Sequence, residues 1–132
     1  MRYEAPITVN EAVKLLAGKA GLAKVLAGGT DLLVQMKTDR IAPDLLVDLK
    51  RIPGMRDIAA KGGGFRIGAA VSGVELGEHK ALKKAWPGVV EAANLIGSHQ
   101  IQGRATIVGN LCNASPAADS VPALVEIGRA HV

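Results

Sequence analysis

The sequence predicts a globular domain that contains both helices and strands, and three observations support this. The chain has 132 residues, enough for one domain or part of a larger one, and its 48% hydrophobic content excludes intrinsic disorder. Residues typical of helix caps precede several apolar segments. Other apolar segments are short and bounded by glycine or proline, as strands are. Because Tyr3, Phe65 and Trp86 are the only aromatic residues, the core must be aliphatic.

Cap residues and chain breaks set the expected order of elements. Thr8 and Glu11 are spaced as in a capping box, which predicts a helix that runs through Leu16 and ends at Gly18. The elements expected after it are a buried strand over residues 24–27, a helix over 32–36 capped by Thr30-Asp31, a strand over 45–49, a hairpin over 58–68 around the glycines 62–64, a short helix from Ser72 to Glu78, and a longer helix over 89–96 that begins near Pro87 and stops at Gly97.

Residues 98–116 are rich in glycine, asparagine, serine and threonine, yet apolar residues recur among them. This combination favours an ordered, packed loop over a flexible linker. A further helix is expected to begin near Asp119.

Charge and composition exclude several classes of protein. The net charge is +4, but the sequence contains no polybasic run and no aromatic residues beside basic clusters, so we expect no nucleic-acid partner. No apolar run reaches the roughly 18 residues of a membrane span, and the N-terminus lacks the apolar core of a secretory signal. Cys112 is the only cysteine, which excludes an internal disulfide and a multi-cysteine metal site. The cytoplasm is the default compartment.

The first candidate motif, Leu26-Ala27-Gly28-Gly29-Thr30-Asp31, leads from a predicted strand into a predicted helix. Glycines let a backbone approach a phosphate closely, and the free amides that follow can donate to it. A plain tight turn explains the same two glycines, so the motif alone leaves both interpretations open. The spacing matches neither a Walker loop nor G-x-G-x-x-G. Lys24 is either a further phosphate ligand or an exposed lysine.

The second candidate motif begins with Thr106-Ile107-Val108-Gly109-Asn110 and continues to Asp119. Its hydroxyl, amide and carboxylate groups suit a ligand with many hydroxyls and a phosphate, such as a dinucleotide. Alternatively, Asn110, Asn113 and Ser115 satisfy the backbone of their own loop through Asx-type turns.

We predict no catalytic residue and no metal ligand. The sequence shows neither a Ser-His-Asp nor a Cys-His arrangement. Cys112 is expected to be a small buried hydrophobic residue rather than a nucleophile.

At these two motifs the chain resembles the FAD-binding subunits of the molybdenum hydroxylases, and more narrowly the medium (M) subunit of the bacterial xanthine dehydrogenase and carbon monoxide dehydrogenase type. Residues 27–31 and 106–110 are similar to the paired FAD-binding motifs of that family. The run Asn-Ala-Ser-Pro-Ala-Ala-Asp-Ser-Val-Pro-Ala over 113–123 is also similar, and weaker similarity covers 46–49 and 102–106. Either glycine motif alone is weak, but the two in this order are specific.

The resemblance implies an α+β fold, namely an FAD-binding domain of the vanillyl-alcohol-oxidase or PCMH type. It would have two subdomains, residues 1–48 and residues 49–132, with FAD between them. The second would be incomplete, and the family's C-terminal domain would be absent. The cofactor-binding positions that the resemblance implies are Val25, Leu26, Ala27, Gly28, Gly29, Thr30, Asp31, Leu32, Ile96, Gly97, Thr106, Ile107, Val108, Gly109, Asn110 and Asp119.

The same resemblance implies an electron-transfer subunit of a larger oxidoreductase. Its partners would be a [2Fe-2S] small subunit and a large subunit with the molybdenum cofactor. FAD would collect electrons from the iron–sulfur clusters and pass them to NAD+, a quinone or another acceptor. The flavin performs the redox chemistry, so no catalytic acid or base is expected from this chain.

The chain departs from the family pattern at two places, which leave other functions open. Val108 stands where the family often has a glycine, and its side chain is expected to loosen the local contact with the cofactor. Residues 125–132 do not resemble the family's continuation, so we expect an N-terminal fragment. The alternatives are a remnant that folds or binds partner subunits without retaining FAD, and a module for another dinucleotide.

Overall fold

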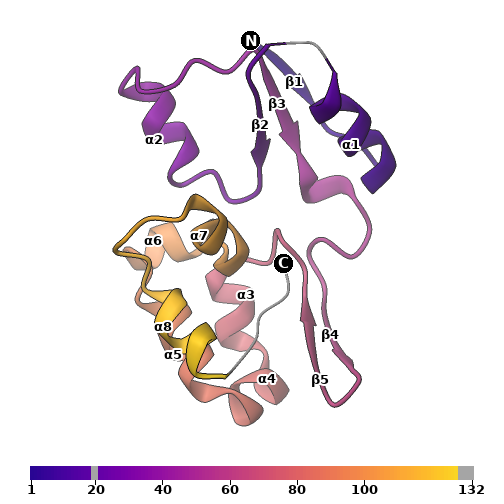
Figure 1. Ribbon diagram of the computed structural model, residues 1–132. Coiled ribbons are helices and arrows are strands. Elements are labelled where there is room, and N and C mark those ends of the chain that lie inside the picture. The colour runs from indigo at the N-terminus through magenta and orange to yellow at the C-terminus, as the bar shows by residue number, and fades with distance from the viewer. Residues whose placement is uncertain (19–20, 128–132) are drawn as a thin grey trace.

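The computed structural model describes residues 1–18 and 21–127 and arranges them in two halves. In Figure 1 the upper half contains a parallel sheet with α1 and α2, and the lower half contains a β-hairpin with the remaining helices. This mixture of helices, parallel strands and an antiparallel hairpin confirms the expected α+β class.

The parallel sheet consists of β1 (Arg2–Glu4), β3 (Leu45–Asp48) and β2 (Ala23–Leu26), in the order β1-β3-β2. All four residues of the central strand β3 are buried. The prediction of a buried strand at 24–27 is correct in position but wrong in burial, because β2 lies at the sheet edge and leaves Val25 44% exposed. Leu26 pairs with Asp48, so β2 and β3 end side by side.

Helix α1 (Val9–Ala17) begins as expected. The Thr8 Oγ1 accepts a hydrogen bond of 3.1 Å from the Glu11 amide, while the Glu11 carboxylate accepts from the amide of Ile7 rather than from that of Thr8. Ala12 of α1 joins a first hydrophobic cluster, which contains the buried side chains Ala12, Leu45, Val47 and Ile52.

Helix α2 (Leu32–Lys37) follows Asp31, but the predicted capping by side chain is wrong for this residue. Asp31 has helical backbone angles, φ −89° and ψ −46°, and makes no capping hydrogen bond. A capping side chain reaches the first amides of a helix from an extended backbone, so Asp31 is not placed to do so. Its carboxylate remains available for other contacts.

The second half begins with the 3₁₀ turn η1 (Leu49–Arg51) and the predicted hairpin of β4 (Ile58–Lys61) and β5 (Gly64–Ile67). Gly62 and Gly63 connect the strands with φ values of 59° and 79°. A two-residue turn with positive φ at both positions suits the twist of a hairpin, which explains the glycines there.

The helices α3 (Gly73–Glu78), α4 (Lys80–Ala85), α5 (Pro87–Asn94) and α8 (Ser120–Glu126) enclose a second hydrophobic cluster. Its buried members are Val71, Leu76, Leu82, Val89, Val90, Ala93 and Ile107. The expected helix after Ser72, the proline at the start of α5 and a helix start near Asp119 are all present, and α3 begins with a complete capping box that was not predicted. Helix α4 was not predicted.

The prediction of a packed loop over 98–116 is wrong, because this segment contains the helices α6 (His99–Gln102) and α7 (Ile107–Asn113). Thr106 caps α7, and Ala114 ends it in the left-handed conformation with φ 52°. Ile107 and Val108 pack on the second cluster. Tertiary contacts thus stabilise a helix whose glycine and asparagine content disfavours one.

The expected divergence over 125–132 falls largely on residues 128–132, which lie outside the described residues. Across residues 1–18 and 21–127, we find no helix with both the length and the apolar content to cross a membrane.

Candidate functional site

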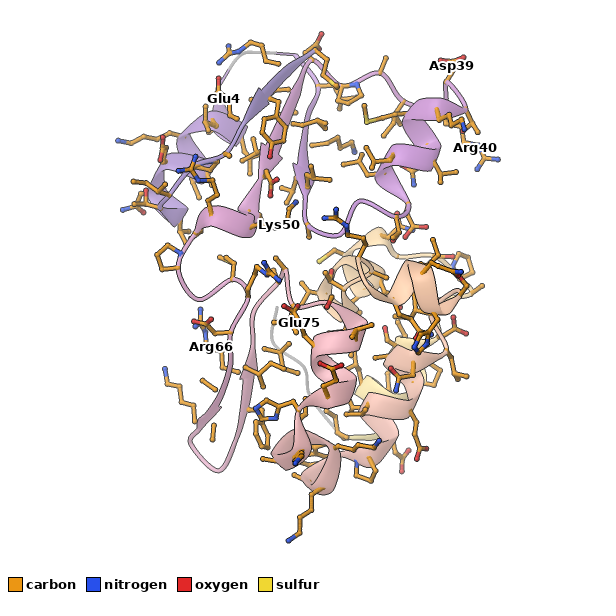
Figure 2. The ribbon with its side chains drawn as sticks, turned by 180° about the vertical axis from the view of Figure 1, so that it is seen from behind. Glu4, Asp39, Arg40, Lys50, Arg66 and Glu75 are labelled. Atoms are coloured by element: carbon orange, nitrogen blue, oxygen red, sulfur yellow. The ribbon has the colours of Figure 1, made fainter. Side chains whose placement is uncertain are left out.

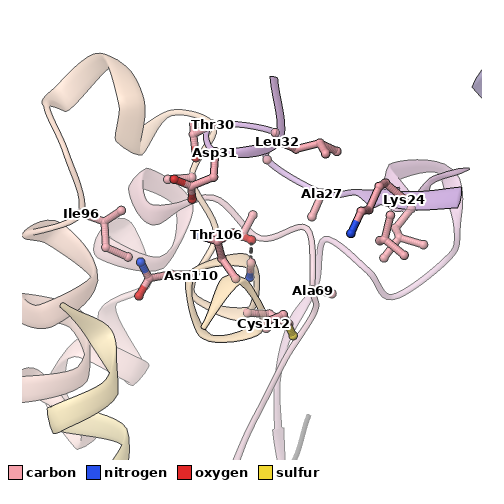
Figure 3. A pocket seen from close by; sticks show the side chains of 18 of the residues that line it. Lys24, Ala27, Thr30, Asp31, Leu32, Ala69, Ile96, Thr106, Asn110 and Cys112 are labelled. Atoms are coloured by element: carbon pink, nitrogen blue, oxygen red, sulfur yellow. Dashed lines mark hydrogen bonds between the residues drawn. The ribbon is translucent and has the colours of Figure 1, made fainter. Parts of the chain in front are cut away.

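A cavity of about 480 Å³ lies between the two candidate motifs (Figure 3), within the range of roughly 300–1,000 Å³ typical of small-molecule sites. One wall is the glycine loop, defined here as Ala27–Asp31, and the other includes the start of α7. In Figure 3, Thr30 and Asp31 face Thr106 and Asn110 across this space. Two motifs far apart in the sequence are therefore brought together.

Most of the predicted cofactor-binding residues line this cavity. They are Val25, Ala27, Gly28, Gly29, Thr30, Asp31, Leu32, Ile96, Thr106, Val108, Gly109 and Asn110. Lys24 also lines it.

Four of the predicted residues do not line the cavity. Leu26 borders a smaller neighbouring cavity, and Ile107 is buried in the second hydrophobic cluster. Gly97 adopts a positive φ of 63° just after α5. Asp119 is exposed and precedes α8.

The fold explains where the glycine loop lies. β2 and β3 are parallel neighbours, so their carboxyl ends meet at the same edge of the sheet. The chain leaves β2 at Leu26 and enters the loop at this edge. Ligands of open parallel sheets bind outside the carboxyl ends of the strands, and the cavity is in that position.

The two glycines of the loop are required for different reasons. A Cβ on Gly28 would lie 2.1 Å from the carbonyl oxygen of Arg104, so this glycine lets the backbones of the two halves touch. Gly29 has φ +81°, and a Cβ there would also lie 2.8 Å from the Leu26 side chain. Two interpretations of these glycines were open, a plain turn and a close backbone approach. Gly29 forms the turn, and Gly28 allows a close backbone approach, here to Arg104 of the protein itself.

Both walls of the cavity present backbone amides without a protein acceptor. Within the described residues, the amides of Gly28, Gly29, Thr30 and Asp31 donate no hydrogen bond, and neither does that of Val108. The Asp31 carboxylate lies beside them, also free of the helix cap. This donor set, with one adjacent acceptor, fits an anionic ligand that also carries hydroxyl groups.

The start of α7 is held in place by two side chains. The Oγ1 of Thr106 accepts from the Gly109 amide at 2.9 Å, and a Cβ on Gly109 would lie 2.6 Å from this oxygen. The Oδ1 of Asn110 accepts from the hydroxyl of Ser120, which is 0% exposed, at 2.5 Å. Asn110 therefore joins α7 to α8 rather than forming a local Asx turn.

The predicted alternative for the other polar residues is correct in one case. The Ser115 hydroxyl accepts from the Ala117 amide, a local turn. Asn113 instead accepts from the Nε2 of Gln35 on α2 at 3.3 Å, so it bridges the two halves beside the cavity.

A buried ionic group lies at the carboxyl end of β3. Asp48 is 4% exposed; its Oδ1 contacts the Lys50 Nζ at 2.8 Å, and its Oδ2 accepts from the Tyr3 hydroxyl. Burial would raise the pKa of Asp48, but the hydrogen bonds from Lys50 and Tyr3 outweigh it and lower this pKa. The same hydrogen bond raises the pKa of the Tyr3 hydroxyl.

Several residues of this region were not predicted from the sequence, and one lies in a different environment from the one expected. Gln35, Leu49, Ala69 and Ala105 line the cavity, and Cys112, expected to be buried, is exposed and lines it too. Cys112 lies on the cavity side of α7, which no pattern in the predicted loop indicated. Lys50 had a usable signal, because it directly follows the predicted strand over 45–49.

Within the described residues, no three His, Cys, Asp or Glu side chains are grouped so that they could hold a metal ion.

Comparison with known proteins identifies the family. The family described as "FAD binding domain in molybdopterin dehydrogenase" matches residues 1–130. The chain belongs to this family of FAD-binding domains. FAD, the cofactor that the resemblance implied, is thus the ligand of the family, and the family expectation is confirmed.

Relatives of this FAD-binding domain are subunits of oxidoreductases. It is 39% identical to the carbon monoxide dehydrogenase medium chain of Hydrogenophaga pseudoflava, over 98% of this chain and 45% of that one. It is 36% identical to the xanthine dehydrogenase FAD-binding subunit of Escherichia coli O157:H7, over 93% and 42%. The FAD-binding domain thus spans less than half the length of these curated relatives.

Solved structures agree with the FAD-binding domain in fold. A crystal structure of the Cu,Mo-CO dehydrogenase in its cyanide-inactivated form superimposes with a TM-score of 0.87 at 35% identity, covering 96% of this chain and 44% of that one. Quinoline 2-oxidoreductase from Pseudomonas putida 86 gives a TM-score of 0.81 at 25% identity, covering 87% and 40%.

Proposed function

We propose that the cavity between the glycine loop and α7 binds FAD. The observation that carries this proposal is the convergence of unpaired amides from both walls on one cavity of about 480 Å³. Amides of the glycine loop and of Val108 would neutralise the charge of the diphosphate, as backbone N–H groups do for bound anions. The Asp31 carboxylate would accept from hydroxyl groups of the ligand.

We propose residues 1–48 and 49–132 as the two FAD-binding subdomains. The separate hydrophobic clusters in the two halves support a division in this part of the chain, although Ile52 packs with the first cluster. The twelve predicted residues that line the cavity are the proposed cofactor ligands. Leu26, Gly97, Ile107 and Asp119 would act on the shape of the site from outside the lining.

For the whole protein we propose an electron-transfer role in a cytoplasmic complex. When bound, FAD accepts electrons and passes them on as pairs or singly. The electron donor would be a [2Fe-2S] small subunit beside a molybdenum-cofactor large subunit, and the acceptor NAD+ or a quinone. The relatives' names support this proposal: a carbon monoxide dehydrogenase medium chain and a xanthine dehydrogenase FAD-binding subunit. This chain's own task is to hold and orient the flavin.

A titration of the chain with FAD, followed by flavin fluorescence, tests the site. We expect saturable binding by the unmodified chain and binding weakened at least about tenfold, or about 1.4 kcal/mol, in Gly29→Val. Gly63→Val is the matched control, since Gly63 also has a positive φ of 79° but lies in the hairpin turn with nothing within 4 Å of its Cβ position. It should bind FAD like the unmodified chain.

Two outcomes would contradict the proposal. Equal FAD affinity in Gly29→Val and the unmodified chain would place the ligand elsewhere. A folded chain without FAD binding would favour the alternative, a remnant that folds or binds partner subunits without retaining FAD.

A further inference from the structure

We propose that Lys50 is a positioning residue that fixes the orientation of the glycine loop for FAD binding. This inference rests on the proposed function. Figure 2 shows Lys50 at the end of the parallel sheet nearest the second half. Its Nζ donates to the carbonyl oxygen of Ala27, the first residue of the glycine loop, at 3.1 Å.

Lys50 is itself held rigidly by Asp48. The Oδ1 of Asp48 contacts the Lys50 Nζ at 2.8 Å and accepts from the Lys50 backbone amide at 2.9 Å. The second carboxylate oxygen accepts from Tyr3 of β1. Asp48 is thereby connected to the other edge of the sheet, and a lysine with both its amide and its ammonium group bound loses much of its rotamer freedom.

The hydrogen bond from Lys50 acts on the peptide unit between Ala27 and Gly28, which supplies the first free amide of the glycine loop. In a planar trans peptide, the carbonyl of Ala27 and the N–H of Gly28 point in opposite directions. Holding the carbonyl toward Lys50 therefore turns the Gly28 N–H away from Lys50. Lys50 borders only the smaller cavity and not the larger one, whereas Gly28 borders both. Lys50 thus acts from behind the loop, through the peptide, rather than on the ligand.

The alternative is that Lys50 only forms a structural ion pair with Asp48, and this alternative predicts a different FAD affinity. If Lys50 served only to neutralise Asp48, its loss would lower stability, and correcting the unpaired carboxylate would restore both stability and FAD affinity. If it positions the loop, the affinity stays low after the carboxylate is neutralised. Comparing the double variant Asp48→Asn/Lys50→Met with Asp48→Asn separates these cases, because neither carries an unpaired carboxylate at position 48 and the two differ only at Lys50.

The experiment measures FAD affinity in Lys50→Met, Lys50→Arg, Asp48→Asn and the double variant, with Lys61→Met of the hairpin as a control. Asp48→Asn, which keeps the Lys50 ammonium group that donates to Ala27, should bind FAD more tightly than the double variant. Because a hydrogen bond from a charged donor is lost, we expect FAD to bind about tenfold more weakly in Lys50→Met and in the double variant. Lys50→Arg, which keeps a donor that reaches Ala27, should recover most of the affinity. Lys61→Met should bind FAD like the unmodified chain.

Backbone NMR order parameters of Gly28 and Gly29 in the FAD-free chain give a second readout. We expect them to fall from values typical of rigid backbone, about 0.85, toward values below about 0.6 in the double variant, with no change in Lys50→Arg or among the amides of α1. Unchanged order parameters, or unchanged FAD affinity in the double variant, would overturn the proposal. An affinity difference that disappears at high salt would also overturn it, since that indicates long-range attraction of the phosphates instead.

The two proposals fail in distinguishable ways. If the unmodified chain does not bind FAD, the proposed function is wrong, and the order parameters of Gly28 and Gly29 alone then decide whether Lys50 positions the loop. If the unmodified chain binds FAD, and Lys50→Met and the double variant bind it as well as the unmodified chain does, only the role of Lys50 is wrong.

Discussion

Gly28 and Gly29 are adjacent, yet a side chain at each would meet a different obstacle. At Gly28 the obstacle is the Arg104 carbonyl, which belongs to the backbone of the other half and can yield only if the halves separate. At Gly29 it is the φ of +81° together with the flexible end of Leu26. Stability therefore depends most on Gly28, and loop conformation on Gly29.

Gly28→Ala is expected to lower the free energy of unfolding by about 1–3 kcal/mol, the range of overpacked sites. Urea unfolding followed by circular dichroism measures this. Gly88→Ala is the control, because nothing lies within 4 Å of its Cβ position in α5, and we expect it to be neutral or slightly stabilising. Equal effects of the two substitutions would show that the close contact of Gly28 does not affect the free energy of unfolding.

Asn110→Ala is expected to cost about 1–3 kcal/mol of unfolding free energy, because the fully buried Ser120 hydroxyl loses its acceptor. Asn113→Ala removes a comparable amide whose hydrogen bond to Gln35 is exposed, and should cost less than about 0.5 kcal/mol. Chemical denaturation of both variants makes the comparison. A similar loss in both would contradict the burial argument.

Among the helices and strands, two carboxylates accept capping hydrogen bonds at the ends of elements. Asp48 ends β3 and caps η1, and Glu75 completes the capping box of α3 with Ser72 while pairing with Arg56. Burial would raise the pKa of Glu75, but the hydrogen bonds from Ser72 and Arg56 lower it, as those of Lys50 and Tyr3 do for Asp48. Both carboxylates therefore stabilise the fold in their charged form.

Stability is expected to fall in acid because of these groups. Their folded-state pKa values lie below the ordinary values of 3.8 and 4.5, so the stabilisation is complete above about pH 5 and is lost as the pH falls through the folded values. Urea unfolding between pH 7 and pH 3 measures the slope. Asp48→Asn and Glu75→Gln should each flatten it; an unchanged slope would mean that other carboxylates cause the acid sensitivity.

Helix α3 shows what a complete capping box contributes. The Ser72 hydroxyl accepts from the Glu75 amide at 3.2 Å, and the Glu75 carboxylate accepts from the Ser72 amide at 2.8 Å. Ser72→Ala should therefore cost about 1 kcal/mol, the usual effect of losing an N-cap. Thr8→Ala removes the cap of the more exposed helix α1, where the Glu11 carboxylate does not accept from the Thr8 amide. It should therefore lower the free energy of unfolding by less than Ser72→Ala does, and thermal unfolding of both variants tests this.

In the molecule as a whole, the two halves contact each other beside the cavity. The Gly28 backbone touches that of Arg104, and Gln35 reaches Asn113. Figure 1 shows the glycine loop between the sheet and α7, where a ligand would touch both halves. A ligand that bridges them adds its binding free energy to the stability of the joined arrangement.

FAD is therefore expected to stabilise the chain against thermal unfolding, by about 2.7 kcal/mol at a free concentration one hundred times its Kd. Differential scanning calorimetry with increasing FAD measures the shift. ADP-ribose at equal concentration should give a smaller shift, because it lacks the flavin. Equal shifts would favour a module for another dinucleotide, and no shift would contradict binding between the halves.

Local signals in the sequence were enough to predict several elements and to indicate the family. Capping residues at Thr8 and Ser72, the glycines of the hairpin and Pro87 act through neighbours in the chain, so their elements were predictable. The order of the two motifs was enough to indicate the family. Local signals did not indicate α4, α6 or α7; the helix propensity of α7 is weak, and contacts with the second hydrophobic cluster stabilise it.

The arrangement of the site depends on tertiary contacts that no local pattern indicates. The role of Gly28 depends on Arg104, which is far away in the sequence, and the contact of Lys50 with Ala27 depends on β2 and β3 being parallel neighbours. Likewise, Asn110 depends on the position of Ser120, and Cys112 lines the cavity because α7 turns it there. Such contacts join residues through strand order and helix packing, and these arise from burial summed over the whole chain rather than from any local pattern.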